Sequence, residues 1–535
     1  MARARCIASA VTLSLFAAAR VGAQSQLHDA ASDQLGTVHF ATSCNAAATP
    51  IFDRSVALVH SFEFGAAIGG FNDVLSADST CAMAFWGIAL SRWSNPMAPG
   101  NRSPEVLAAG KRAADAASRL AIGATTRERG YIGAVSELYA DYEHRDTRTR
   151  VVAYERAMNA LAAAQPADTE AQIFHALALV AAASPTDKSY ASQRQAGEVL
   201  ESLWVKLPNH PGLAHYIIHA YDVPALAPLA RRAAERYSRI APAVPHALHM
   251  PSHVFTRVGM WRESIDANRK SIAAARRDGS IAEALHALDY ETYAALQLRD
   301  DSAVRSILTV LPTLVARFDP NVVSGAAPGS AGAFAIAAIP ARVALEHRDW
   351  KSAAELHATT TAFPYADAVT YFARSLGASH LGDRAAARVG VDSLVVLRTR
   401  LANHGESYWA EQVAIQQLGA QAWMDFAGHH ADVALAEMRE ACTREDATEK
   451  SAVTPGPLAP AHELFGDMLM ALHRPADALA EYELTLTKEP NRYLSMRGAM
   501  LAARGAENRG KAARYASAIA SMTHSRHTPK AVTRD

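Results

Sequence analysis

A pattern that repeats every 34 residues is the feature that most constrains how this chain folds. Its clearest copy, over residues 457–490, combines small residues, large apolar residues and a closing proline: Phe465, Gly466, Leu469, Ala478, Tyr482, Leu486 and Pro490. The small residues allow two helices to pack closely, while the large ones fill the space between neighbouring units. A repeat of this length therefore predicts pairs of helices stacked along the chain.

Weaker copies of the pattern extend over most of the 535 residues. They are centred on residues 58–71, 86–90, 196–208, 252–264, 349–353 and 382–387. Segments rich in Ala and Leu at helical spacing, such as 151–164 and 283–297, dominate the rest, and alternating strand patterns are almost absent. We therefore expect an all-α fold, a right-handed α-solenoid of about eight to ten helix pairs over residues 47–524.

The chain resembles the secreted bacterial tetratricopeptide-repeat (TPR) proteins over roughly residues 47–520. The resemblance implies that the first helices of successive units line a concave groove, which binds a peptide, a protein or a small-molecule ligand. It implies little about chemistry, because proteins of this family are mostly interaction scaffolds with varied partners. This chain departs from the common pattern in its histidines.

The N-terminus has the order of parts of a secretory signal peptide. Arg3 and Arg5 precede an apolar run over residues 6–19, and small residues follow up to Ala23. We expect residues 1–23 to be removed and the protein to be periplasmic or secreted. A buried N-terminal helix is the alternative.

Residues 24–46 are expected to form an N-terminal arm. Cys44 and Cys81 would form a disulfide in an oxidising compartment, which would tie the arm to the solenoid. Two free buried thiols are the alternative.

Two segments interrupt the repeat pattern. Residues 318–332 are rich in Gly, Pro, Ala and Ser and predict a loop, and residues 443–457 predict an ordered insertion before the clearest repeat. The last residues, 525–535, predict a disordered tail.

The composition excludes several classes of function. Lys and Arg together number 53, as do Asp and Glu, so no overall positive charge attracts nucleic acid, and we expect no nucleic-acid partner. Apart from the N-terminus, no stretch is apolar and long enough to predict a membrane span. Nucleophile elbows and phosphate-binding glycine loops are absent, which argues against a serine hydrolase or a nucleotide enzyme.

A histidine-rich stretch over residues 210–293 holds the candidate site, since seven of the 22 histidines fall within it. His215 and His219 are four residues apart and share one helix face. His246, His249 and His253 are spaced by three and then four residues, which also places them on one face. The 34-residue offset relates His215 to His249 and His219 to His253, so the two faces should lie side by side.

Further polar residues occupy equivalent positions on neighbouring helices. They comprise one more imidazole, four carboxylates and a phenol: His286, Asp222, Asp289, Glu463, Asp467 and Tyr293. We expect His286 to be a metal ligand. The carboxylates and the phenol would be additional ligands, partners that orient the imidazoles, or a general acid or base.

Neutral imidazoles are ligands for transition metals such as Zn, Cu and Fe. Six of them in one patch predict one or two ions, with a histidine groove for an anionic or peptide ligand and purely structural histidines as the alternatives. Two functions follow. The first is a binding or scaffold protein that uses the groove for a ligand or partner. The second is a metalloenzyme, either a hydrolase with metal-bound water or an oxidase with a redox metal.

Two other patterns predict structural roles only. His60 and His175 occur singly on apolar helices, which favours structural histidines. Arg342 and Glu346 are four residues apart in a helix and predict an ordinary ion pair.

Overall fold

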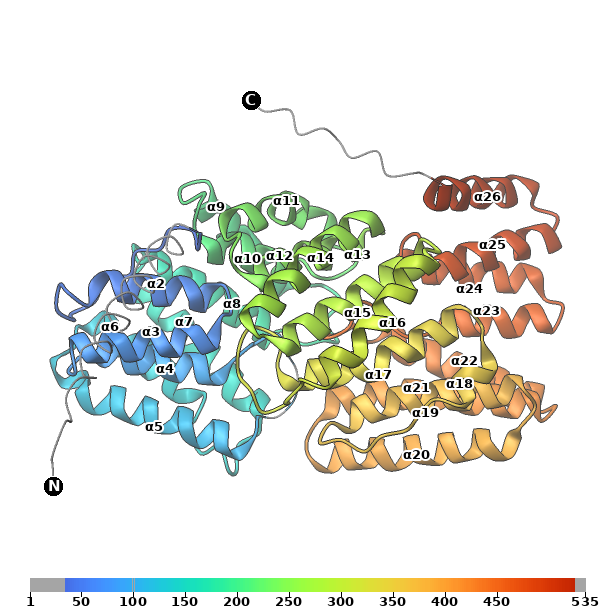
Figure 1. Cartoon of the computed structure of the whole chain (residues 1–535), viewed down its shortest axis with the longest axis horizontal. Coiled ribbons are helices and arrows are strands. Elements are labelled where there is room, and N and C mark those ends of the chain that lie inside the picture. The colour runs from blue at the N-terminus through green and yellow to red at the C-terminus, as the bar shows by residue number, and fades with distance from the viewer. Residues whose placement is uncertain (1–33, 99, 101, 525–535) are drawn as a thin grey trace, which may run out of the picture.

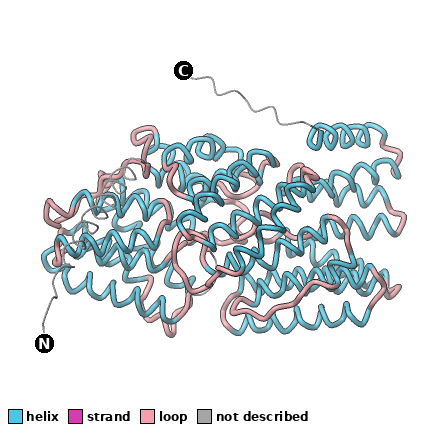
Figure 2. Tube along the Cα trace, in the orientation of Figure 1, coloured by secondary structure: helices cyan, strands magenta, loops and turns pink. Residues whose placement is uncertain are grey.

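The computed structural model describes residues 34–98, 100 and 102–524, and these form helices joined by turns and loops (Figures 1 and 2). No strand occurs among them, so the predicted all-α fold of stacked helix pairs is confirmed. None of these helices is long and apolar enough to cross a membrane. The predicted signal peptide, 1–23, and the predicted tail, 525–535, lie outside the described residues.

The first part of the chain forms the helices at the left of Figure 1, in which consecutive helices pack on one another. They are α2 (Thr49–His60), α3 (Phe64–Ala77), α4 (Ala82–Trp93), α5 (Pro104–Leu120), the 3₁₀ turn η1 (Ala121–Gly123), α6 (Thr126–Glu137), α7 (Thr147–Ala164), α8 (Thr169–Ala182) and α9 (Ala191–Trp204).

The central helices, green in Figure 1, carry the histidine-rich stretch. They are α10 (Pro211–Ala220), η2 (Ala227–Ala230), α11 (Arg231–Ile240), α12 (Pro245–His249), α13 (Pro251–Arg257), α14 (Trp261–Asp278), α15 (Ile281–Gln297) and α16 (Asp301–Val315).

The remaining helices occupy the right of Figure 1. They are α17 (Gly329–Glu346), α18 (Trp350–Ala354), α19 (Pro364–His380), α20 (Arg384–Asn403), α21 (Ser407–Ala427), α22 (Ala431–Asp446), α23 (Ala461–Ala471), α24 (Pro475–Lys488), α25 (Tyr493–Gly505) and α26 (Arg509–His524).

Close helix contact at small residues explains the pairing of α23 with α24. A Cβ atom added to Gly466 would lie 2.9 Å from the ring of Tyr482, so any larger side chain would push the two helices apart. The side chain of Ala478, the other small residue of this repeat, is fully buried. These contacts have the form that the 34-residue pattern predicts.

Two large apolar cores meet within the central helices. One extends from Leu35 to Phe255 and the other from Ala282 to Tyr515. The chain also curls back on itself, because the indole of Trp261 at the start of α14 donates to the carbonyl of Asn491, just before α25, at 3.0 Å. The histidine-rich stretch therefore lies at the junction of two halves.

The described part of the N-terminal arm, residues 34–46, packs against the first half. Phe40 is fully buried, with its ring 5.3 Å from that of Trp86. A disulfide joins Cys44 to Cys81, just before α4, so the arm is covalently tied to the solenoid.

The two predicted interruptions are present with shifted bounds. Helix α17 begins at Gly329, so the first interruption ends at Pro328 instead of residue 332. Helix α22 continues to Asp446, so the second interruption covers residues 447–460 instead of 443–457. Each begins where a helix ends and leads into the N-terminus of the next, and both turn towards the histidines.

Candidate metal centre

Six histidines from four central helices converge at the junction of the two halves. His215 and His219 come from α10, His246 and His249 from α12, His253 from α13 and His286 from α15. None of the six is more than 6% exposed. The open groove that the resemblance to TPR proteins implied is therefore closed here, since segments outside the repeat cover the imidazoles.

A break in the helix changes the predicted register only slightly. The spacing of His246, His249 and His253 predicted one continuous helix, but α12 ends at His249 and α13 begins at Pro251. Proline lacks the N–H that would continue the helical hydrogen bonds and clashes with the preceding turn. The three rings still face the same cluster.

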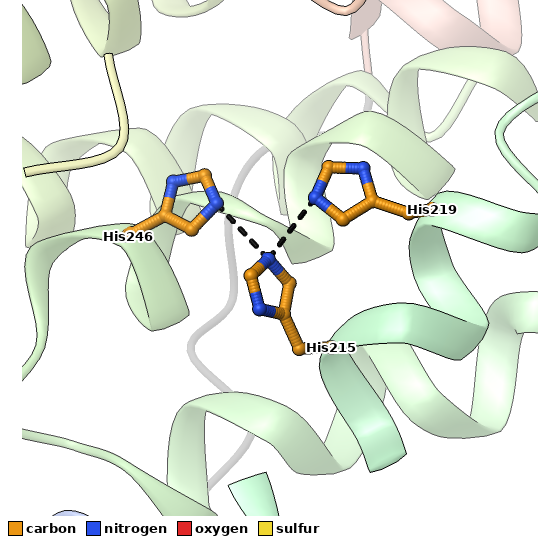
Figure 3. A group of neighbouring side chains, drawn as sticks. All are labelled: His215, His219 and His246. Atoms are coloured by element: carbon orange, nitrogen blue, oxygen red, sulfur yellow. Dashed lines mark hydrogen bonds between the residues drawn. The ribbon is translucent and has the colours of Figure 1, made fainter. Parts of the chain in front are cut away.

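The first trio consists of His215, His219 and His246 (Figure 3). Figure 3 shows the Nε2 atoms of all three rings pointing to one place. The Nε2 of His215 lies 3.1 Å from that of His219 and 3.1 Å from that of His246.

The second trio consists of His249, His253 and His286. The Nε2 atoms of His249 and His253 are 3.0 Å apart, and one nitrogen of His286 lies within 4.8 Å of both potential ligand atoms. Each trio thus combines two histidines four residues apart in the sequence with one histidine from another helix, which is α12 for the first trio and α15 for the second. The 34-residue offset predicted that the helix faces of His215 and His249 lie side by side, and these two residues belong to the two different trios.

The two trios are adjacent and form one cluster. The ring centres of His219 and His253 are 6.3 Å apart, and those of His246 and His249 are 6.0 Å apart. Two ions, one in each trio, would therefore be close neighbours.

Hydrogen bonds fix the tautomer of two rings in the first trio. The Nδ1 of His215 lies 2.6 Å from the carbonyl oxygen of His60, and the Nδ1 of His246 lies 3.0 Å from Oε1 of Glu283. The backbone carbonyl can only accept a hydrogen bond. The carboxylate of Glu283 is also an acceptor, because its pKa, which burial alone would raise, is held below its ordinary value mainly by His246. Both Nδ1 atoms are therefore donors, and a neutral ring in this tautomer carries its lone pair on Nε2.

The second trio repeats this arrangement. The Nδ1 of His249 donates to Oδ1 of Asn268 at 2.7 Å, and the Nδ1 of His253 donates to Oδ2 of Asp222 at 2.9 Å. The amide of Asn268 is oriented by its own NH₂ group, which donates to the carbonyl of Ser264 at 2.7 Å. The Nε2 lone pairs of His249 and His253 consequently face each other.

Facing lone pairs at about 3 Å repel unless a cation lies between them. Protonation is an unfavourable way to supply it, since burial lowers the pKa values of His215, His219 and His249 well below the ordinary range. Burial also lowers the pKa of His253, although Asp222 opposes the effect, and it lowers the pKa of His286 to about 3. The geometry and the tautomers suit a metal ion in each trio.

An aromatic ring forms one wall of each trio. The ring centre of Phe62 lies 4.4 Å from that of His215 and 5.5 Å from that of His219. The ring of Tyr290 lies 4.8 Å from that of His249 and 4.8 Å from that of His253. These walls limit access of water to the imidazoles.

A small cavity of about 20 Å³ lies over both trios. His219, His246, His253 and His286 line it, together with residues of the two interruptions: Ala326, Ala327, Pro328, Ala452 and Val453. A volume of this size holds about one water-sized molecule. The interruptions of the repeat therefore form the cover of the histidine cluster.

A larger cavity of about 500 Å³ adjoins the small one, and both are lined by Ala98, His219 and Ala452. Its walls come from both halves of the chain: Met97, Arg102, Arg148, Val151 and Val180 from the first, and Glu406, Tyr408, Trp409, Glu449 and Lys450 from the second. Cavities of this size at the junction of two units are typical sites for small organic molecules.

Asp222, which was predicted to be a metal ligand or a partner that orients an imidazole, lies next to the second trio. Besides accepting from His253, its Oδ1 accepts from Arg257 at 2.9 Å. Burial alone would raise the pKa of Asp222, but the charges of Lys450 and Arg257 hold it well below its ordinary value. The carboxylate thus orients His253 and does not belong to either trio.

Asp289 and Tyr293 lie on the inner face of α15 but have other partners. Asp289 pairs with Arg342 at 2.8 Å, and the hydroxyl of Tyr293 donates to Oε2 of Glu489 at 3.0 Å. The predicted ion pair of Arg342 with Glu346 is wrong, because Arg342 pairs with Asp289 on α15. Glu346 instead pairs with Arg492, just before α25, at 2.7 Å.

Glu463 and Asp467 likewise face inward on α23 without reaching the histidines. Glu463 binds Arg492 with both oxygens, at 2.8 and 2.9 Å, and Asp467 binds Arg348 at 2.8 Å. The inner helices therefore carry two distinct polar regions, the histidine cluster and a buried network of ion pairs.

Several residues of the centre were not predicted from the sequence. Glu283 lies three residues before His286 on α15, a spacing that would have placed both on one face. Asn268, the backbone carbonyl of His60 and Tyr290 come from other positions of the repeat and carry no such signal. The ring of His60, predicted to be a structural histidine, lies between Glu170 and Tyr216 at 2.8 and 3.0 Å.

Two further groups of potential ligands occur among the described residues. In the first, Glu170 accepts from His60 at 2.8 Å and from His210 at 2.9 Å, so its oxygens are already occupied. In the second, His462 bridges Glu481 and Asp446, beside Cys442. Neither group has facing lone pairs, and hydrogen bonds account for both.

The sequence matches no protein-family model and no curated protein. Among solved structures, the fold is similar to that of human IFIT1, described as a dimer with PPP-AAAA, at a TM-score of 0.41 and 9% identity over 89% of this chain and 95% of that one. Yeast Tom70 is similar at a TM-score of 0.38 and 12% identity, over 87% and 96% of the two chains. Likenesses this remote carry no information about function, which rests on the side chains of this chain.

The lowered histidine pKa values predict loss of stability in acid for the metal-free protein. Unfolded histidines take up a proton below about pH 6.5, whereas the buried ones stay neutral to lower pH. The unfolding free energy should therefore fall as the pH decreases from about 6.5 towards 3, by about 1.4 kcal/mol per pH unit for each such histidine. Urea unfolding of the metal-free protein between pH 8 and pH 4 measures this slope.

A matched variant separates this effect from general acid denaturation. His286→Gln removes one buried imidazole and should reduce the slope below pH 6.5. Stability of the wild type that stays level or rises between pH 6.5 and pH 4 would contradict the prediction.

Proposed function

We propose that this protein binds two copper ions, one in each trio, and that it is an oxidase acting on a small organic molecule. The observation that carries the proposal is that Nε2 atoms face each other in each trio. The Nε2 atoms of His215 and His246 are 3.1 Å apart, and those of His249 and His253 are 3.0 Å apart. The tautomers are set by oxygen acceptors on the far side of the rings, as is usual for histidines that bind metals.

The donor set favours copper. Both trios consist of neutral imidazoles only, with no carboxylate among the potential ligand atoms. Carboxylate-rich sites suit Mg, Ca and Mn, whereas nitrogen ligands suit Cu and Zn, and copper(II) is the divalent ion that nitrogen sites bind most strongly. The carboxylates of Asp222 and Glu283, each bonded to the Nδ1 of one ring, would balance the charge of two Cu(I) ions.

Three protein ligands leave a coordination position open, as in catalytic metal sites. These positions would face the cavity of about 20 Å³, which has room for one diatomic molecule or water. Copper held by these histidines would supply redox chemistry with dioxygen as the oxidant. A substrate in the cavity of about 500 Å³ would lose two electrons and two protons, and dioxygen would become hydrogen peroxide.

Hydrolysis is the less favoured reaction, because a metal-bound water needs a nearby general base. Asp222 already accepts hydrogen bonds from His253 and Arg257. Glu283 already accepts from His246 and from the backbone N–H of Ala327. Neither carboxylate is free to take a proton from water.

Burial also disfavours the scaffold function that the fold suggests. An extended peptide in the groove would have to touch the imidazoles, yet none of the six is more than 6% exposed. Of the six histidines and their carboxylate partners, only His219 and Asp222 line the larger cavity, where a small molecule would fit.

Copper loading tests the proposal. Metal-free protein is titrated with Cu(I) in the absence of oxygen, dialysed and analysed for metal, and then exposed to dioxygen in an oxygen electrode with a reductant. We expect about two copper ions per chain and uptake of dioxygen that Zn(II)-loaded protein does not show. Tight binding of zinc with no tight binding of copper, or copper-loaded protein that consumes no dioxygen, would overturn the oxidase.

The Cys44–Cys81 disulfide supports the proposal that the protein is exported, since disulfides persist in oxidising compartments. A periplasmic or secreted location also fits an enzyme that uses dioxygen.

A further inference from the structure

A buried amine whose hydrogen-bond donors are unsatisfied lines the larger cavity. Lys450, in the second interruption, lines the cavity, and its side chain is only 7% exposed. Within the described chain its Nζ atom makes no hydrogen bond. A buried ammonium group is costly unless an anion or several acceptors surround it.

The nearest carboxylate does not satisfy this amine. Oδ1 of Asp222 lies 3.8 Å from the Nζ of Lys450, beyond hydrogen-bond distance, and it already accepts from Arg257 at 2.9 Å. Burial, followed by the charge of Arg257, lowers the pKa of Lys450 to about 8, so the amine is still largely protonated at neutral pH.

The other charges on the cavity wall are two arginines and two glutamates, and neither glutamate forms an ion pair with Lys450. Among the described residues, the guanidinium of Arg102 donates only to backbone carbonyls, and so does that of Arg148 at the exposed mouth. Of the carboxylates, Glu449 is bound by Lys188 at 2.7 Å, and burial raises the pKa of Glu406.

We propose that the larger cavity binds a small organic anion with an aromatic or aliphatic body, and that Lys450 binds its carboxylate. The apolar wall contributed by Met97, Val151 and Trp409 would contact the body of the molecule. This inference names the substrate class of the proposed oxidase and rests on that function.

The position of Lys450 connects the anion site to the metal centre. Its Nζ lies 5.9 Å from the ring centre of Tyr290, which stacks on His253 with ring centres 4.8 Å apart. A carboxylate bound there would hold the molecule beside His219, the only imidazole of the cluster that lines both cavities.

The test compares two probes of nearly equal shape, benzoate and benzyl alcohol, by calorimetric titration of the full-length metal-free protein. We expect benzoate to bind the wild type about ten- to a hundredfold more tightly than benzyl alcohol, as a hydrogen bond to a charged group predicts. In Lys450→Met this preference should disappear, while benzyl alcohol binds as before. The matched control, Lys206→Met, removes an exposed lysine far from the cavity lining and should change neither affinity.

Lys450→Arg keeps the positive charge and should retain most of the preference for benzoate, which distinguishes charge recognition from a packing role. Equal affinities of the two probes for the wild type, or an unchanged preference in Lys450→Met, would overturn the anion site. If Lys450→Met does not fold, the wild-type comparison and Lys450→Arg still decide. Because these titrations use metal-free protein, failure of copper binding would leave their outcome intact, and failure of anion binding would leave copper binding intact.

Discussion

Substitution of His215 by Ala should remove one metal ion and leave the other. His215 has the central Nε2 atom of the first trio, 3.1 Å from those of His219 and His246, so its loss leaves two ligands in that trio. His249→Ala should have the same effect on the second trio, because His249 faces His253 at 3.0 Å. We expect about one ion per chain in each single variant, about two in the wild type and none in the double variant, since three protein ligands are needed to hold each ion.

Metal analysis after copper loading measures the stoichiometry, and melting curves with and without a chelator report its effect on stability. A ligand at a hundred times its dissociation constant stabilises a protein by about 2.7 kcal/mol, so chelation should lower the melting temperature of the wild type and leave that of the double variant unchanged. The control is His175→Ala, since His175 bonds Glu155 at 3.3 Å outside the cluster. Full metal content in the double variant would refute both sites.

The repeat pattern predicted the helices because they follow from local spacing, and the resemblance to TPR proteins implied that the histidines face inward. Residues four apart on a helix share a face, so His215 and His219 were recognisable as a chelating pair from the sequence alone. The 34-residue offset also predicted that the helices carrying these histidines are neighbours. These relations need no knowledge of long-range contacts.

The division into two trios was not predictable in this way. It depends on the break of the helix at Pro251 and on the reach of His246 back towards α10, where its Nε2 meets that of His215. The oxygen acceptors that set the tautomers, such as Asn268 and the carbonyl of His60, come from other helices. Only the folded chain brings them together.

The cover of the site was the second feature that the repeat could not show. An ideal solenoid leaves its concave face open, and the two interruptions were assigned no role in the centre. Ala327 and Ala452, one from each interruption, both line the small cavity. Burial of the imidazoles, and hence the preference for an enzyme over a scaffold, follows from these two segments.

Arg342→Met should destabilise the protein by about 3–5 kcal/mol, the cost typical of breaking a buried ion pair on one side. Arg342 is fully buried and binds Asp289 at 2.8 Å, and its other N–H groups donate to the hydroxyl of Thr454 at 2.6 Å and to the carbonyl of Gly456 at 2.9 Å. The variant would leave Asp289 buried without a counter-charge and would release the second interruption. Urea unfolding of the metal-free protein measures the loss.

The double variant Arg342→Met, Asp289→Leu provides the matched comparison, because it removes both charges and should recover part of the lost stability. Arg444→Met, which breaks a half-exposed ion pair with Glu411, should cost no more than about 1 kcal/mol. A cost of that same size for Arg342→Met, or no recovery in the double variant, would contradict the buried-pair explanation. Since Thr454 follows the residues that cover the small cavity, Arg342→Met should also lose copper to a chelator faster than the wild type, whereas Arg444→Met should not. The same guanidinium would then hold the fold together and keep the metal centre closed.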